Sequence, residues 1–259
     1  MSKISPYYFP FGQLLKRVQQ TDCTPKRVFV LGVYASAVHA RWIGKEGRDK
    51  IKALAVASEP CIFWRGEKAE EIIASITIPE QLGRLTIPSD QTLNGPSGIA
   101  LDKLFLERMG LERRDAWLCD LLPESRVNPL QRKAIEKCYN SEVAKFNLPS
   151  ATIPDFDEGE LGRQEGTRRA EILEELESSE AKTLVLLGDL PIRWFLNYYD
   201  KRYSTLSDFG ERYGCSHKIM INKRNYAVIP LCHPRNAARL GTYGKKWAER
   251  HDRWKPDKI

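Results

Sequence analysis

The sequence predicts an α/β protein with a three-layer α/β/α fold around a central, mostly parallel, four-stranded sheet. Four short apolar runs have the composition of buried strands: Arg27–Gly32, Ala116–Leu122, Thr183–Gly188 and Tyr226–Leu231. Stretches with helical spacing separate these runs, and strands joined through crossover helices lie parallel in one sheet. The 259 residues, of which 42% are hydrophobic, are enough for a single domain over residues 1–259.

Helices are expected between these strands. Asn128 at the N-cap, with Pro129 and Gln131 after it, predicts a helix that continues to about Phe146. The stretch Val33–Trp42 is expected to turn into a helix, with Ser36 as a possible N-cap and His39 inside the helix. The remaining expected elements are a weak helix at Asp49–Ala57, a short outer strand at Cys61–Trp64, helices at Ala69–Ile76, Ser97–Met109, Arg163–Ser178 and Pro191–Tyr199, and loops at Ile78–Asn94 and Leu148–Glu160.

Composition narrows the class of partner. The net charge of +7 favours phosphate-bearing partners, although an ordinary basic protein would have the same balance. The six cysteines form no CxxC pair, so we expect reduced thiols in the cytoplasm, with neither a metal nor another cofactor. The polar N-terminal segment (residues 1–26) does not have the pattern of a signal peptide, and no apolar run is long enough for a membrane span. The basic C-terminal tail (residues 241–259) either follows phosphates or is a solvated helix end.

Four strand ends carry the residues that suggest a site: Gly32–Ser36, Asp120, Gly188 and His233. Carboxyl ends of parallel strands meet at one edge of the sheet, where α/β proteins bind their ligands. Basic residues follow His233 directly, and they indicate an anionic ligand. Composition and periodicity alone therefore predict a sheet with a histidine at its ligand-binding edge.

The order and content of these motifs resemble the uracil-DNA glycosylase superfamily from about Arg27 to Leu240. Asn94–Cys138 is similar to the Gly-x-x-Gly, helix, strand and Asn-Pro series of the thermostable branch. The His-Pro motif at His233, with Asn236 nearby, resembles the single-strand-selective branch. The thermostable branch holds an iron–sulfur cluster with four cysteines, and only Cys138 has a counterpart here, so no cluster is expected.

The resemblance implies an enzyme that flips a nucleotide out of DNA and cleaves its N-glycosidic bond. It gives His233 the role of donating a hydrogen bond to O2 of the departing base. Four residues fall where the family has its minor-groove wedge and phosphate contacts: Arg235, Asn236, Arg239 and Leu240. The alternatives are a structural histidine at a strand end and a solvated basic loop.

The first motif departs from the family pattern. It reads Gly32-Val33-Tyr34-Ala35-Ser36, whereas family members often carry an Asp, Asn or Glu at the second or third position to place the attacking water. Either another residue holds the water or hydrolysis is lost. Asn94 is the first candidate, although it suits an Asn-Gly turn equally well, and Asp90 and His39 are weaker ones.

Two further departures bear on the base. Ser36 replaces the Tyr that blocks C5 in uracil-selective members, so a C5 substituent has room, and Tyr34 is expected to flank or stack on the base. Asp120 replaces the Asn that reads uracil, and a carboxylate accepts well from the amino group of cytosine.

Together these departures predict a DNA glycosylase for a C5-modified cytosine. The modification would be hydroxymethylcytosine or a larger derivative, such as occurs in phage DNA, which implies a defence role. No lysine lies at an obvious attack position, so we expect a monofunctional enzyme that acts on DNA as a cytoplasmic monomer. The alternatives are a repair glycosylase for uracil or other deaminated bases and a non-catalytic DNA-binding member.

Overall fold

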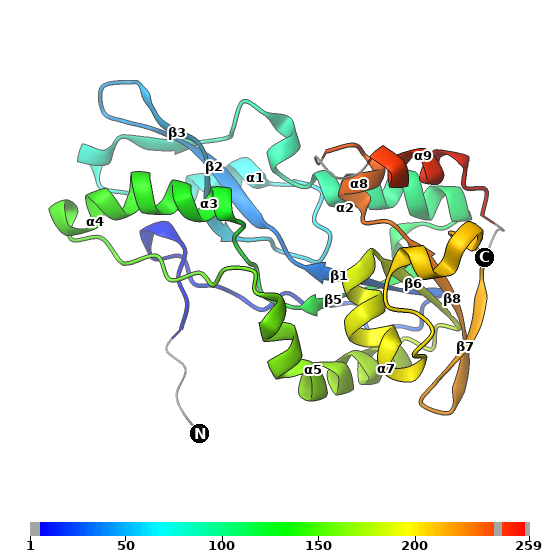
Figure 1. Cartoon of the computed structure of the whole chain (residues 1–259). Helices are drawn as coiled ribbons and strands as arrows, with labels where there is room; N and C mark the ends of the chain where they lie inside the picture. The colour runs from blue at the N-terminus through cyan, green and yellow to red at the C-terminus, as the bar shows by residue number, and fades with distance from the viewer. Residues whose placement is uncertain (1–5, 241–244, 257–259) are drawn as a thin grey trace.

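The computed structural model describes residues 6–240 and 245–256 of the chain. Its centre is a five-stranded sheet in the order β5–β1–β6–β8–β7 (Figure 1). In chain order the strands are β1 (Val28–Tyr34), β5 (Ala116–Leu122), β6 (Thr183–Leu187), β7 (His217–Ile221) and β8 (Arg224–Leu231). The four predicted strands pair in parallel, and β7 joins β8 antiparallel. The α/β class and the mostly parallel sheet are confirmed.

The predicted number of four strands was wrong because β7 has a different pattern. Its residues alternate between buried and exposed, with His217, Ile219 and Ile221 inside and Lys218 and Met220 outside. An antiparallel edge strand keeps one face in water and therefore has no continuous apolar run. The parallel strands β5 and β6 are buried along their whole length, which is why their composition revealed them.

Helices flank the central sheet, with α5 and α7 on one side and α2, α8 and α9 on the other (Figure 1). Asn128 caps α3 through a capping box with Gln131, as the sequence predicts, and the helical stretch ends at Phe146. The helices are α1 (Ala69–Ala74), α2 (Pro96–Ala100, continued by helical turns to Met109), α3 (Pro129–Ala134), α4 (Asn140–Phe146), α5 (Glu158–Ser178), α6 (Asp189–Pro191), α7 (Asn197–Tyr199), α8 (Pro234–Ala237) and α9 (Lys245–Arg253).

A second sheet, in the order β3–β2–β4, stands where the sequence suggested two helices and, for β4, a loop. It consists of β2 (Ala37–Ile43), β3 (Asp49–Ser58) and β4 (Arg84–Thr86), all antiparallel. The helices expected over Val33–Trp42 and Asp49–Ala57 were therefore wrong, and so was the N-cap at Ser36. Strand pairing overrides the helix propensity of this alanine-rich segment, because burial against neighbours decides strand formation more than local preference does.

The segment Cys61–Trp64 is a turn, so the outer strand expected there was also wrong. The N-terminal segment, whose composition is polar, contributes two aromatic side chains to the protein interior. Phe9 and Phe11 are buried in a second hydrophobic core between the β2–β3 sheet and the α3–α4 helices, where Phe11 packs edge-on against Trp42 and Tyr139. Residues 1–5 of this predicted segment lie outside the described residues.

The predicted basic tail folds back onto the protein over its described part. Helix α9 carries exposed Lys and Arg side chains, but Ala248 and His251 are buried, as is Trp254 just after the helix. The ring of His251 lies 2.9 Å from the carbonyl oxygen of Leu104. Residues 241–244 and 257–259 of the tail lie outside the described residues.

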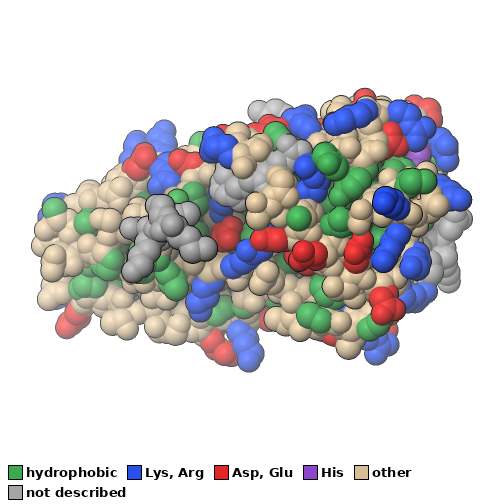
Figure 2. Space-filling view, turned by 90° about the horizontal axis from the view of Figure 1, so that it is seen from below, with side chains coloured by type: hydrophobic (Ala, Val, Ile, Leu, Met, Phe, Trp, Pro, Cys, Tyr) green, Lys and Arg blue, Asp and Glu red, His purple; other side chains and the backbone are tan. Residues whose placement is uncertain are grey.

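The charge of the chain is not gathered on the face that α5 and α7 cover. Figure 2 shows that face, with Lys and Arg side chains interspersed among Asp and Glu. A phosphate-binding surface requires positive charge that neighbouring acids do not cancel. Within the described part of the chain, no helix combines the length and the apolar character needed to cross a membrane.

Candidate functional site

The site is built around Asp120, at the carboxyl end of β5. Asp120 is paired in register with Gly32 of β1, and its side chain is 3% exposed. A Cβ atom on Gly32 would lie 2.3 Å from Oδ1 of Asp120 and 2.7 Å from Cζ of Phe63. Glycine is required at position 32 because the Asp120 carboxyl and the Phe63 ring occupy the space above it.

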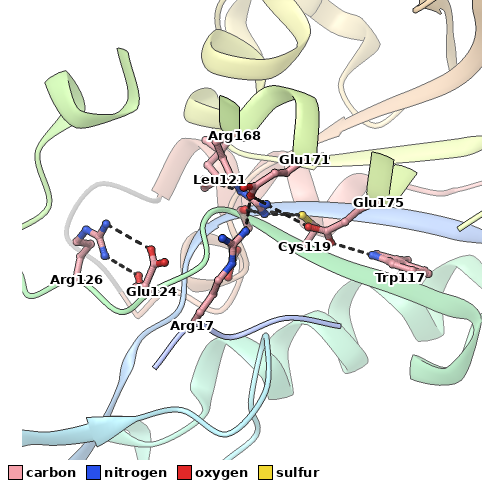
Figure 3. Close-up of polar contacts among 10 residues, drawn as sticks. Arg17, Trp117, Cys119, Leu121, Glu124, Arg126, Arg168, Glu171 and Glu175 are labelled. Atoms are coloured by element: carbon pink, nitrogen blue, oxygen red, sulfur yellow. Dashed lines mark hydrogen bonds and ion pairs between the residues drawn. The ribbon is translucent and has the colours of Figure 1, made fainter. Parts of the chain in front are cut away.

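Burial raises the pKa of Asp120 to about 7, against an opposing effect of Arg168. The guanidinium of Arg168 contacts the strand backbone, donating to the carbonyl oxygens of Asp120 at 2.7 Å and Leu121 at 3.2 Å (Figure 3). Its charge is also shared with Glu171 and Glu175 of the same helix, at 2.8 and 3.2 Å. With a pKa of about 7, the Asp120 carboxyl is mostly protonated below neutral pH and about half protonated at pH 7.

Phe63 was not identified from the sequence. Its φ is 50°, a left-handed conformation that is costly for a bulky residue. Arg113 stabilises the turn, donating to the Phe63 carbonyl oxygen at 2.7 Å, and a Cβ on Gly98 of α2 would come 2.1 Å from the same oxygen. Isolated aromatic residues in irregular segments produce no periodic signal, so only the contacts reveal Phe63.

His233 lies at the end of β8 with its imidazole neutral. Burial, together with the charge of Arg235, lowers the pKa of His233 to about 4. The backbone N–H of Arg235 donates to Nδ1 of His233 at 3.2 Å. Because Nδ1 is the acceptor, the neutral ring carries its proton on Nε2, which is then free to donate to a ligand.

The segment before β7 holds this strand end in place. The Tyr213 hydroxyl accepts from the backbone N–H of Cys232 at 3.1 Å and lies 2.8 Å from Nδ1 of His251. Cys232 directly precedes His233, so the Tyr213 contact fixes the backbone from which the imidazole extends. The stretch Lys201–Asn225, which has no obvious function in the sequence, thus positions His233.

Asp120 and His233 lie at the same edge of the sheet, separated by β1 and β6. Three strand spacings of about 4.8 Å separate β5 from β8 by roughly 14 Å. The two strands between them carry glycines near this edge: Gly32 lies inside β1 and Gly188 directly follows β6. The backbone N–H of Gly188 donates to the carbonyl oxygen of Leu231 at 2.7 Å. Gly32 and Gly188 place no side chain of their own between the Asp120 carboxyl and the His233 imidazole.

The loop after His233 is basic and partly exposed. Arg235 donates from Nε to the carbonyl oxygen of Leu240 at 3.2 Å. Its charge adds to the effect of burial that lowers the pKa of His233, and it opposes the effect of burial that raises the pKa of Tyr34. Arg239 adopts a φ of 57° and forms an exposed ion pair with Asp252 of α9. The Asn236 backbone N–H donates to the His233 carbonyl oxygen at 2.8 Å. Arg235 is the predicted DNA contact that lies beside the site.

Tyr34 is the last residue of β1, and Ser36 lies two residues after it. The Tyr34 ring stacks on Phe156, with 5.2 Å between ring centroids and 29° between the planes. Ser36 is exposed, and its carbonyl oxygen accepts from Oγ of Ser125 at 2.6 Å. A cavity of about 610 Å³ adjoins Phe156 and is lined by Val127, Pro129, Arg132, Lys133, Glu136, Lys137 and Asp155.

The three residues that were candidates for holding water are engaged elsewhere. The Asn94 amide accepts from the backbone N–H of His39 at 2.8 Å and donates to the His39 carbonyl oxygen at 3.0 Å, so it braces β2. The His39 ring lies 3.1 Å from the Leu93 carbonyl oxygen and 2.7 Å from the Gln131 amide nitrogen. Asp90 is exposed and caps the turn at Thr92. Each of these three side chains therefore already has hydrogen-bond partners within the protein.

Glu59 is the second residue that was not identified from the sequence. It comes directly after β3 and is 7% exposed. Burial and the charge of Asp120 raise the pKa of Glu59 to about 8. The pairing of Ala37 with Ser58 brings Glu59 to the first motif, and this pairing was hidden because β2 and β3 looked helical.

Neither the protein-family models nor the curated proteins with which the chain was compared give a match. Among the side chains that the structure describes, no three from His, Cys, Asp or Glu form a cluster suited to a metal ion.

The buried Asp120 carboxyl should make the protein less stable as the pH rises. Its pKa is 3.8 in the unfolded chain and about 7 in the folded one, so the folded state binds more protons between these values. The contribution of the protonated Asp120 carboxyl to the free energy of unfolding is fully present below about pH 4 and is lost as the pH rises through 7. The loss is on the order of 4 kcal/mol. We expect Asp120→Asn to raise the melting temperature relative to the wild type by more at pH 8 than at pH 5.

The matched control is Asp90→Asn, which removes an exposed carboxylate whose pKa is lowered and which stays ionised at both pH values. Its effect on the melting temperature should be the same at pH 5 and pH 8. An Asp120→Asn effect that is equally independent of pH would mean that Asp120 is solvated and charged in the folded protein.

Proposed function

We propose that this protein is a DNA glycosylase that flips a C5-modified cytosine out of DNA and hydrolyses its N-glycosidic bond. The observation that carries the proposal is the burial of Asp120 over Gly32, opposite a neutral His233 on the same sheet edge. An aspartate with a purely structural role at a strand end would face solvent or cap a turn. A buried carboxyl that keeps its proton near pH 7 is the kind of group that functional sites use.

In the proposed complex Asp120 reads the edge of the base. Its neutral form donates to N3 of cytosine and accepts from the N4 amino group, and transfer of the proton to N3 makes the base a better leaving group. His233 donates from Nε2 to O2, where negative charge accumulates as the bond breaks. Phe63 supplies an aromatic face beside the base.

A neutral Asp120 could also pair with uracil, by accepting from N3–H and donating to O4. Discrimination against uracil therefore depends on proton transfer to N3, which uracil does not need because its N3 already carries a proton. This is the specific reason to keep a uracil repair glycosylase as the second candidate function.

The exposure of Ser36 supports a substituent at C5. The C5 substituent would extend out of the site between Ser36 and Tyr34. It would point towards the side where Phe156 borders the cavity beside α3. We infer hydroxymethylcytosine or a larger derivative, as in phage DNA, and a defence role. The enzyme would act on DNA as a monofunctional monomer, and its contacts with the duplex would come from Arg235, Asn236, Arg239 and Leu240. It would work in the cytoplasm, a compartment that the six free cysteines suit.

One assay tests the proposal. Oligonucleotides that contain uracil, cytosine, 5-methylcytosine, hydroxymethylcytosine or glucosylated hydroxymethylcytosine are incubated with the protein, and abasic sites are counted after alkaline cleavage. We expect release of the modified cytosines with bulky C5 groups and no release of plain cytosine. Release of uracil alone would replace the proposal with a repair glycosylase, and tight DNA binding without any release would indicate a non-catalytic binding protein.

A further inference from the structure

We propose that the C-terminal helix α9 positions His233, and that His251 is the positioning residue through which the helix acts. This inference rests on the proposed glycosylase function, in which His233 donates to O2 of the base. It starts from the unequal support of the two sides of β8. On one side the Leu231 carbonyl oxygen accepts from the N–H of Gly188, after β6. On the other side β7 pairs with β8 no further than Val228, so no described strand lies beside the last residues of β8 there.

The segment Tyr213–Gly214 takes the place of the missing strand. The backbone N–H of Gly214 donates to the carbonyl oxygen of Pro230 at 3.0 Å. The Tyr213 hydroxyl accepts from the backbone N–H of Cys232 at 3.1 Å. Both bonds lie beyond the last pair of β7 and β8, and Cys232 directly precedes His233. The position of the His233 backbone therefore depends on how firmly Tyr213 and Gly214 are held.

Helix α9 and the residue after it hold both members of this segment. Nδ1 of His251 lies 2.8 Å from the Tyr213 hydroxyl. Trp254 donates from Nε1 to the Gly214 carbonyl oxygen at 3.0 Å, and a Cβ atom on Gly214 would lie 2.4 Å from Cδ1 of Trp254. The absence of a side chain at Gly214 lets the indole lie against the backbone. Two separate contacts thus connect α9 to the end of β8.

The hydrogen bonds of His251 have one consistent direction. Burial lowers the pKa of His251 to about 4, so its ring is neutral at pH 7. Its Nε2 lies 2.9 Å from the Leu104 carbonyl oxygen, which can only accept, so Nε2 carries the proton. Nδ1 then accepts from the Tyr213 O–H. Sγ of Cys232 also lies 3.3 Å from this hydroxyl, but an imidazole nitrogen is the stronger acceptor. The lone pairs of the hydroxyl oxygen are left for the Cys232 N–H.

His251 is itself held firmly. It is 1% exposed, and its ring packs against Phe105 and Trp254, with centroid distances of 4.2 and 5.1 Å. Arg108 donates to the His251 carbonyl oxygen at 2.7 Å and also to that of Trp254. Phe105 and Arg108 belong to the helical turns after α2, on the same side of the central sheet as α9 (Figure 1). A displacement of about 1 Å at a reacting group can slow a reaction about 10²-fold, so this bracing matters for His233.

The test measures base release under single-turnover conditions, on the substrate that the oligonucleotide panel identifies. His251→Leu removes both hydrogen bonds of the ring, whereas His251→Asn keeps an oxygen near the position of Nδ1 that can accept from Tyr213. We expect release to slow by about 10- to 10²-fold in His251→Leu and to recover towards the wild-type rate in His251→Asn, with unchanged DNA affinity in both. The matched control is Glu249→Gln, an exposed acid of the same helix, which should release base at the wild-type rate.

A double-mutant comparison separates positioning from general stability. If His251 acts through His233, adding His251→Leu to His233→Ala causes no further loss of rate. Tyr213→Phe, which keeps the ring and removes only the hydroxyl, should behave in the same way, and it decides the question if His251→Leu does not fold.

Two results would overturn the inference and leave the glycosylase proposal intact. One is an equal loss of rate with and without the His233 imidazole, and the other is a wild-type rate in Tyr213→Phe. Failure of the wild type to release any base would overturn both.

Discussion

Replacing His233 by alanine is expected to slow base release by about 10²- to 10³-fold, the loss typical of one preorganised donor to a developing anion, or about 3–4 kcal/mol. The donor is already oriented, because the Arg235 N–H bond to Nδ1 leaves the proton on Nε2 and the Tyr213 contact fixes the preceding backbone. Single-turnover release measures the effect. The Kd for DNA should change little, since the bond forms mainly in the transition state.

His233→Gln is the control for this prediction. Its amide N–H can donate while the side chain keeps a similar reach, so a partial recovery over alanine identifies the donor role. Equal rates for alanine and glutamine, with melting temperatures lowered alike, would instead indicate a histidine that only stabilises the start of α8. A rate that stays at the wild-type value in both variants would remove His233 from the site.

Asp120→Asn is expected to reduce release of cytosine-type bases by about 10²- to 10⁴-fold while uracil release is kept or gained. The amide can form hydrogen bonds to either base, but it has no acidic proton to transfer to N3. Cytosine-type bases need that proton to leave, whereas uracil carries one at N3 already. The ratio of the two release rates, measured on matched oligonucleotides, is therefore the readout.

Comparing two substrates in one variant controls for folding, because a damaged protein would lose both activities together. Parallel losses for uracil and modified cytosine would mean that Asp120 supports the strand rather than reads the base. An unchanged ratio with full activity would place the specificity elsewhere, and the exposed side of Ser36 would then be the first place to examine.

The sequence was informative where burial is complete. The continuous apolar runs of β5, β6 and β8 were visible in composition, and so was the α3 start at Asn128, because both depend on neighbouring residues alone. The sequence was misleading over β2 and β3, because these two strands form by pairing with each other. A segment such as Asp49–Ser58 has helix-forming residues, and only pairing makes it a strand.

The same difference separates the site residues. Asp120 lies near the carboxyl end of β5 and His233 just after β8, so the sequence by itself predicts that both lie at the carboxyl edge of the sheet. It also provides the basic residues of the loop after His233. Glu59 and Phe63 lie in an irregular turn that the β2–β3 pairing and Arg113 position, so nothing local indicates them. Protonation is likewise a tertiary property: burial raises the pKa of Asp120 and lowers that of His233, because desolvation acts only once the chain has folded around each group.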